Sequence, residues 1–143
     1  MTIVNSVNTS LCKVSLRSDD IIEIRFKQDE YEVDVKDQKE IESAVFELMS
    51  DQSKSYHILV LPGLYGGITK EAREMEMFES PAYKNQKAIV IVVNSLFQRI
   101  LGSMYYSLKK KKPNYPYKLV ASEALAMDWI VNHQKELNLI NPV

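Results

Sequence analysis

A pair of glycines followed by basic residues is the feature of this sequence best suited to ligand chemistry. Gly66 and Gly67 leave their backbone amides unobstructed just before a predicted helix start at Thr69, and Lys70 and Arg73 add positive charge. Amides and cations in this order can bind a phosphate or a carboxylate. The segment is not a P-loop, because no Gly-Lys-Ser/Thr follows the glycines. We prefer a plain turn with Thr69 as a helix cap, since glycine usually marks a backbone geometry.

Ser95 and Arg99 extend this candidate anion site. They lie one helical turn apart at the start of a predicted helix that follows a buried strand. In open α/β sheets, ligands bind at the edge where strands end and helices begin. Arg99 either contributes to a ligand site at that edge or forms an ordinary ion pair with an acidic residue of a neighbouring helix. Both interpretations stay open.

Residues for catalysis or metal binding are sparse. His57 falls in a buried strand pattern and His133 in the last predicted helix, so neither a metal pair nor a Ser-His arrangement is indicated. Each is interpreted as a structural histidine. Cys12 is the only cysteine, which excludes a disulfide within the chain and a thiolate metal cluster. We therefore expect no enzyme, no metal and no cofactor.

A lysine block at residues 109–112 lies next to several tyrosines. Such a block could contact anionic lipid or RNA. A solvated helix end is the preferred interpretation, because lysines complement the negative pole of a helix and no second basic block supports the first. With a net charge of -1 and a pI near 6.1, we expect no nucleic-acid partner.

The helix predicted from Ser95 carries an apolar arc broader than a sheet needs for cover. Excess apolar surface suggests a partner or an amphiphilic ligand. The candidate interface residues are Phe97, Leu101, Met104, Tyr105 and Leu108. The preferred hypothesis is a noncatalytic interaction module that forms a homodimer or binds a regulatory protein. The alternative is a carrier that holds a lipid-like molecule between the helices starting at Thr69 and Ser95, lined by Met75, Met77 and Phe78.

The elements that must position these residues follow from periodicity. Residues 56–61 and 88–93 are continuous apolar runs and predict parallel strands buried on both faces. Residues 11–17 and 22–27 alternate and predict an antiparallel hairpin at an edge of the sheet. Residues 117–120 predict a last short strand.

Four helices are expected between and after these strands. Their predicted caps are Asp34, Thr69, Ser95 and Ser122, and the second helix is expected to run from Thr69 towards Phe78. The result is an α/β fold with a mixed, mostly parallel sheet of about five strands in the order ββαβαβαβα. Residues 1–9 are expected to be a flexible N-terminus and residues 10–143 a single domain. No window is apolar enough for a membrane helix, so we expect a cytoplasmic protein without integral membrane association.

This order of elements, together with three motifs, resembles the STAS domain of bacterial anti-sigma-factor antagonists. It is most similar to an uncharacterised bacterial branch of STAS-like proteins. The motifs are Ile-Thr-Lys-Glu-Ala-Arg at residues 68–73, Ser-x-x-x-Arg-x-x-Gly at residues 95–102, and Lys-Pro-x-x-Pro-x-Lys-Leu at residues 112–119 before a Glu-Ala-x-x-x-x-Trp helix start at residues 123–129.

The resemblance implies a regulatory module with a phosphorylatable Ser or Thr after the third strand, next to an Asp, whose phosphate switches binding of a partner kinase. Here the corresponding turn at residues 61–67 has no Asp-Ser pair. Thr69 is the nearest hydroxyl, and a phosphate there would lie at a helix N-terminus. We prefer a capping role for Thr69.

Overall fold

Two buried parallel strands form the centre of the sheet. The computed structural model describes residues 2–140, and in it β5 (Tyr56–Leu61) lies parallel to β7 (Gln86–Val92), with Ile58 opposite Ile89. Continuous apolar strands of this kind need cover on both faces of the sheet. The predicted parallel pair is confirmed.

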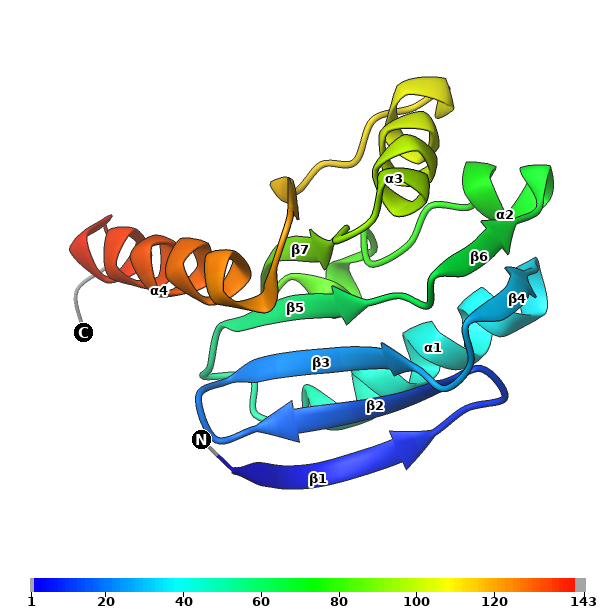
Figure 1. Cartoon of the computed structure of the whole chain (residues 1–143). Coiled ribbons are helices and arrows are strands. Elements are labelled where there is room, and N and C mark those ends of the chain that lie inside the picture. The colour runs from blue at the N-terminus through cyan, green and yellow to red at the C-terminus, as the bar shows by residue number, and fades with distance from the viewer. Residues whose placement is uncertain (1, 141–143) are drawn as a thin grey trace.

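The sheet around this pair is mixed and mostly parallel (Figure 1). Its order is β1-β2-β3-β5-β7-β8. Strand β2 runs antiparallel to its neighbours β1 and β3, while β3, β5, β7 and β8 are parallel. The other four strands are β1 (Ile3–Asn8), β2 (Cys12–Arg17), β3 (Ile21–Phe26) and β8 (Tyr117–Val120). The α/β class is confirmed, but this sheet has six strands where about five were expected.

The sixth strand is β1, which lies in the segment expected to be a flexible N-terminus. It pairs with β2, so the predicted hairpin of β2 and β3 lies inside the sheet and its assignment to an edge was wrong. Ile3 and Val4 are 49% and 63% exposed. With these two side chains facing solvent, β1 has no buried alternation that would predict a strand from the sequence. Backbone pairing with β2 holds it in place.

A separate two-stranded sheet replaces the turn expected at residues 61–67. Within it, β4 (Glu30–Val33) and β6 (Tyr65–Ile68) pair in parallel, with Tyr31 opposite Gly66. A Cβ on Gly66 would lie 2.3 Å from the Tyr31 ring. Gly66 therefore allows a close approach of backbone and ring, and its assignment to a turn was wrong.

The helices begin at the predicted caps. They are α1 (Val35–Leu48), α2 (Lys70–Glu74), α3 (Leu96–Leu108) and α4 (Glu123–Ile140), with a short 3₁₀ turn η1 (Pro81–Tyr83) before β7. Backbone amides donate to the side chains of Asp34, Thr69, Ser95 and Ser122. The expected extension of α2 towards Phe78 was wrong, because the helix ends at Glu74.

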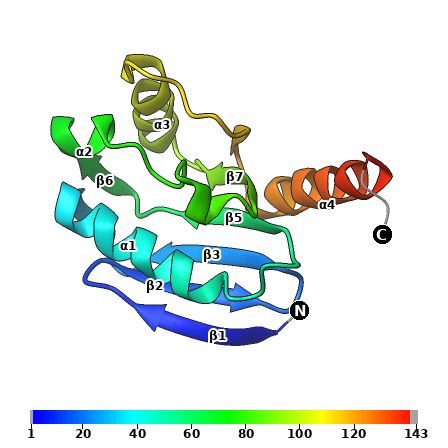
Figure 2. The same cartoon turned by 180° about the vertical axis from the view of Figure 1, so that it is seen from behind.

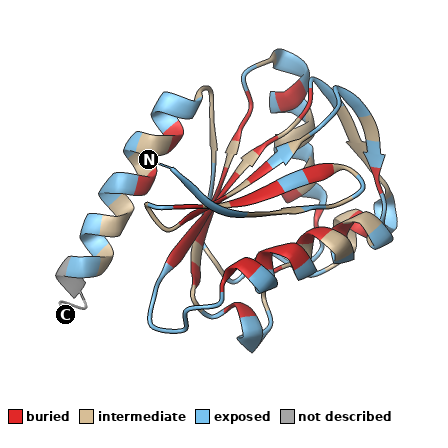
Figure 3. Cartoon of the chain, turned by 90° about the horizontal axis from the view of Figure 1, so that it is seen from below, coloured by how far each residue is buried: buried red, intermediate tan, exposed pale blue. Residues whose placement is uncertain are grey.

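Helices cover both faces of the sheet. One face packs against α1, which Figure 2 shows lying across β1 to β3, and α1 contributes Ile41, Val45 and Leu48 to the larger core. The other face packs against α4 through Ala126 and Ile130. Buried residues concentrate in the strands and along α1, whereas α4 is mostly exposed or partly exposed (Figure 3).

Candidate functional site

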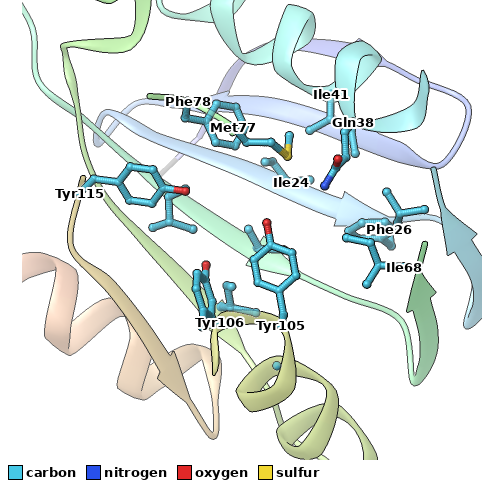
Figure 4. Close-up of a pocket in the computed structure, with 15 residues that line it drawn as sticks. Ile24, Phe26, Gln38, Ile41, Ile68, Met77, Phe78, Tyr105, Tyr106 and Tyr115 are labelled. Carbon is cyan, nitrogen blue, oxygen red and sulfur yellow. The ribbon is translucent and has the colours of Figure 1, made fainter. Parts of the chain in front are cut away.

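An apolar cavity of about 190 Å³ lies between α3 and the sheet, on the face that α1 also covers (Figure 4). The strands supply Ile24, Phe26, Val33, Val60, Ile68, Ile89 and Ile91, the helices supply Gln38, Ile41, Gly102, Tyr105 and Tyr106, and the irregular segments supply Met77, Phe78 and Tyr115. Cores are normally packed with few voids larger than a water molecule. An apolar space of this size is therefore a candidate binding site.

A second hollow of about 430 Å³ adjoins this cavity. The two share lining residues, among them Phe26, Val60, Ile91 and Tyr105. The second hollow then continues past Leu101 of α3 to β6 and the start of α2. The two hollows adjoin beneath α3, and we call the smaller, which no charged side chain lines among the described residues, the inner cavity.

Helix α3 is attached at both ends by buried polar side chains. At its start, Nε2 of Gln98 donates to the carbonyl oxygens of Pro62 and Gly63 at 3.2 and 2.9 Å. At its end, Nζ of Lys109 donates to the carbonyl oxygens of Arg73 and Met75 at 2.7 and 2.8 Å. The two ends of α3 are therefore held by hydrogen bonds, and the turn between them, with Gly102 and Tyr105, lines the cavity.

Three tyrosines bring hydroxyl groups to the cavity. Figure 4 shows the hydroxyls of Tyr105, Tyr106 and Tyr115 pointing inward from α3 and from the segment before β8. Burial raises the pKa of Tyr105 to about 12 and also raises the pKa values of Tyr106 and Tyr115. All three phenols are consequently neutral at physiological pH, and they offer hydrogen bonds without charge.

The remaining polar group in the cavity is the side-chain amide of Gln38 on α1. Gln38 is 3% exposed, and its Oε1 has no hydrogen-bond partner among the described residues. The amide points into the cavity (Figure 4). Buried polar atoms in proteins are nearly always paired, so an unpaired one needs an explanation.

The predicted anion-site residues are divided by the fold. Gly66, Gly67 and Arg73 all line the wider hollow, and Thr69 caps α2. Lys70 is exposed. Both glycines lie in strand β6 and have no positive φ, so they do not form the amide-lined turn from which the anion site was inferred.

Ser95 and Arg99 lie elsewhere at the same end of the sheet. Ser95 caps α3, and Arg99 lines a different hollow with Val93 and Leu119. No ion pair of Arg99 is found among residues 2–140, so neither of the two interpretations of Arg99 gains support. The seven predicted anion-site residues therefore do not converge on one point.

The predicted interface residues fall on two sides of α3. Phe97 is exposed, and Leu101 and Tyr105 line the space beneath the helix. Met104 and Leu108 lie at the margin, because they are about half exposed and also line the wider hollow. The exposed side also includes Leu96 and Ile100, which the prediction omitted. We call Leu96, Phe97, Ile100, Met104 and Leu108 the outer face of α3.

One lysine of the block at residues 109–112 departs from the expected solvated helix end. Lys109 is buried and bonded to backbone carbonyls, as described above. Nζ of Lys111 lies 2.8 Å from Glu76, and the backbone amide of Lys110 donates to Glu74. The ammonium groups of Lys109 and Lys111 thus attach the end of α3 to residues 73–76, while Lys110, Lys111 and Lys112 stay exposed.

The two histidines meet on the opposite face of the sheet. Nε2 of His57 lies 2.8 Å from Nδ1 of His133, and the ring of Trp129 stacks on His133. Burial, with the charges of His133 and Lys87, lowers the pKa of His57 to about 4. Within the described residues, no group of three or more His, Cys, Asp or Glu side chains is arranged to hold a metal ion.

Gln38, Tyr106 and Tyr115 are the functional candidates that the sequence analysis missed. The sequence could have pointed to Gln38, since it lies one turn before Ile41 on the apolar side of α1. A polar residue at a position where the helical pattern requires an apolar one often indicates a functional site. Tyr115 carries no such signal, because it lies in an irregular segment between two prolines.

Comparison with known proteins identifies the family of this chain. No curated protein and no solved structure matches it. Over the part of the chain that the structure describes, none of the helices has the length and apolar character required to cross a membrane. One family model, described as a domain of unknown function (DUF7793), matches residues 14–134. The chain therefore belongs to the DUF7793 family.

Proposed function

We propose that this protein is a noncatalytic module that binds a small apolar or amphiphilic molecule in the cavity beneath α3. The observation that carries the proposal is the apolar space of about 190 Å³ between α3 and the sheet. Engineered apolar cavities of about 150 Å³ stay dry and bind benzene-sized molecules. A ligand would restore the packing contacts that the lining side chains lack.

The attachment of α3 supports this role. The helix is bonded through Gln98 and Lys109 at its ends, while Gly102 and Tyr105 of its middle turns line the cavity. Gly102 lets α3 lie close to Leu119 and Val93, since a Cβ there would lie 3.4 Å from each side chain. Displacement of this short helix would admit a ligand without disturbing the pairing of the central strands.

The order of elements is compatible with a STAS-like module. With β1, β4 and β6 set aside, the remaining elements run ββαβαβαβα, the order of the resemblance noted in the sequence. We retain the STAS-like assignment and a cytoplasmic location as part of the proposal. The phosphorylation switch of antagonist STAS domains is not part of it, because Thr69 is used as the cap of α2.

Native mass spectrometry of the purified protein tests the proposal. We expect the wild-type chain to carry a noncovalent mass, and Val60→Phe to lose it, because Val60 lines both hollows. Val131→Phe is the matched control, since Val131 is an exposed residue of α4 on the other side of the sheet. A wild-type protein that carries no added mass and binds none of a set of benzene-sized probes would refute the proposal.

Self-association is a second candidate function, favoured by the outer face of α3. Its five apolar side chains are each at least 45% exposed. Contiguous apolar patches on a soluble domain often mark interaction sites. A homodimer, or a complex with a regulatory protein, would cover this face while leaving the cavity on the inner side of α3 available.

A further inference from the structure

The unpaired amide of Gln38 gives information about the ligand that the cavity alone does not. Its Oε1 has no partner among the described residues although the side chain is 3% exposed. An apolar residue of the same size would fit this position on α1 without leaving a hydrogen-bonding group unsatisfied. The amide is therefore explained by a group that enters the cavity and bonds to it.

The lack of charged side chains among the described residues of the inner cavity limits which polar group the ligand can carry. No Asp, Glu, Lys, Arg or His is among its described lining residues, and the polar side chains present are an amide and three phenols. Burial of an ionised group without a charged partner is strongly unfavourable. An amide offers both an acceptor and a donor, so it can bond a neutral hydroxyl, amide or similar group.

The dimensions and lining limit the body of the ligand. The inner cavity, at about 190 Å³, is somewhat larger than the engineered cavity of about 150 Å³ that accepts benzene. Phe26, Phe78 and Tyr105 present aromatic rings to it, and Met77 presents its thioether (Figure 4). Aromatic and sulfur contacts favour a flat ring over a flexible chain.

We infer that the inner cavity binds an uncharged molecule about the size of one substituted aromatic ring, and that Gln38 forms a hydrogen bond with its single polar group. This inference rests on the proposed function and specifies its ligand class. A simple phenol satisfies each of these requirements: a ring, one neutral hydroxyl and no ionised headgroup.

Isothermal titration with two probes of equal shape tests the inference. p-Cresol and p-xylene differ by one hydroxyl in place of one methyl group, so their affinity ratio isolates the polar contact. We expect Gln38→Leu to shift this ratio towards p-xylene by about tenfold relative to wild type, because the cresol hydroxyl loses its partner. Gln86→Leu is the matched control: Gln86 is also buried with an unpaired Oε1 but lies outside the cavity, so its ratio should equal that of wild type.

Each outcome has a distinct meaning. An unchanged ratio in Gln38→Leu overturns the role of Gln38 but leaves the proposed function standing, provided that either probe binds. Binding of 4-methylbenzoate at neutral pH as tight as that of p-cresol overturns the requirement for an uncharged ligand. Failure of all three probes to bind wild type contradicts both the inference and the proposed function. Gln38→Met, which keeps the side-chain length, replaces Gln38→Leu if thermal unfolding shows that the leucine variant is not folded.

Discussion

Two buried polar side chains, Gln38 and His57, each have an unpaired atom, but only Gln38 borders a cavity. Gln38 of α1 lines the cavity between α3 and the sheet and has an unpaired Oε1, and His57 of β5 lies on the sheet face under α4 and has an unpaired Nδ1. His57 has a partner for its other nitrogen in His133 and belongs to a packed cluster with Trp129. Gln38 instead borders an open volume, so its missing partner can be supplied from outside the chain.

The first prediction concerns the stability cost of Gln38. Gln38→Leu should raise the free energy of unfolding of the ligand-free protein by about 1 kcal/mol, because an unsatisfied buried polar group costs about 1–3 kcal/mol and leucine has none. Urea unfolding followed by circular dichroism measures this. A residue kept for function at the expense of stability is expected to behave in this way. A variant less stable than wild type would show that the amide is satisfied within the fold.

The second prediction concerns pH and His57. Because burial lowers the pKa of His57 from 6.5 to about 4, the unfolded chain binds a proton below pH 6.5 that the folded chain does not bind until about pH 4. Stability is therefore lost as pH falls through this window, at most by about 1.4 kcal/mol per pH unit. We expect a loss of about 2 kcal/mol between pH 7 and pH 5 in urea unfolding.

His57→Gln provides the control for the pH prediction. Glutamine has a similar polar side chain that does not titrate, so the variant should be less sensitive to pH over the same interval. An equal slope for the variant and wild type would assign the pH dependence to other groups. The candidate ligand site lies on the opposite face of the sheet, so probe affinity should be unaffected by this substitution.

At the scale of elements, the sequence predicts those strands and helix starts that depend only on neighbouring residues. Continuous apolar runs identified β5 and β7, and side-chain oxygens identified the starts of all four helices. The strands β1, β4 and β6 were missed because none of them has a continuous apolar run. The two four-residue strands β4 and β6 are held by pairing with each other across a long stretch of sequence, and β1 is held by pairing with β2. The cavity could not be predicted either, since it depends on how far α3 lies from the sheet.

The third prediction concerns strand β6. Gly66→Ala should destabilise the protein by about 2 kcal/mol, because its Cβ would meet the Tyr31 ring at 2.3 Å. The ring cannot move away easily, since it stacks on Phe26 with centroids 4.4 Å apart and its hydroxyl accepts a hydrogen bond from the amide of Gly63. Gly67→Ala is the matched control, because the nearest atom to its Cβ is 3.8 Å away.

Thermal unfolding of the two alanine variants separates a packing role of Gly66 from the anion-site hypothesis. A packing role lowers the melting temperature of Gly66→Ala alone, with or without phosphate. An anion site at the two glycines would instead make wild-type stability increase with phosphate concentration, and both alanine variants would lose that increase. We expect the first result, because both glycines lie in a paired strand.

At the scale of the whole molecule, α3 separates two surfaces with different roles. Its inner side closes the cavity with Leu101, Gly102 and Tyr105, and its outer face presents apolar side chains to solvent. A partner bound to the outer face would restrict the same helix that a ligand displaces when it enters. Ligand binding and association would then be thermodynamically coupled, and each would change the affinity of the other by the same factor.

The fourth prediction tests association through the outer face. Ile100 is 50% exposed on α3, so Ile100→Asp should leave the folded monomer intact while placing a charge at the centre of any interface. Size-exclusion chromatography with light scattering should give a dimer for wild type and a monomer for this variant. Val131→Asp, at a position on α4 that is 40% exposed and lies away from α3, should remain dimeric. A wild-type protein that is monomeric at concentrations up to about 100 μM, or a dimer that survives Ile100→Asp, would contradict association through α3, since stable interfaces depend on a few central apolar contacts.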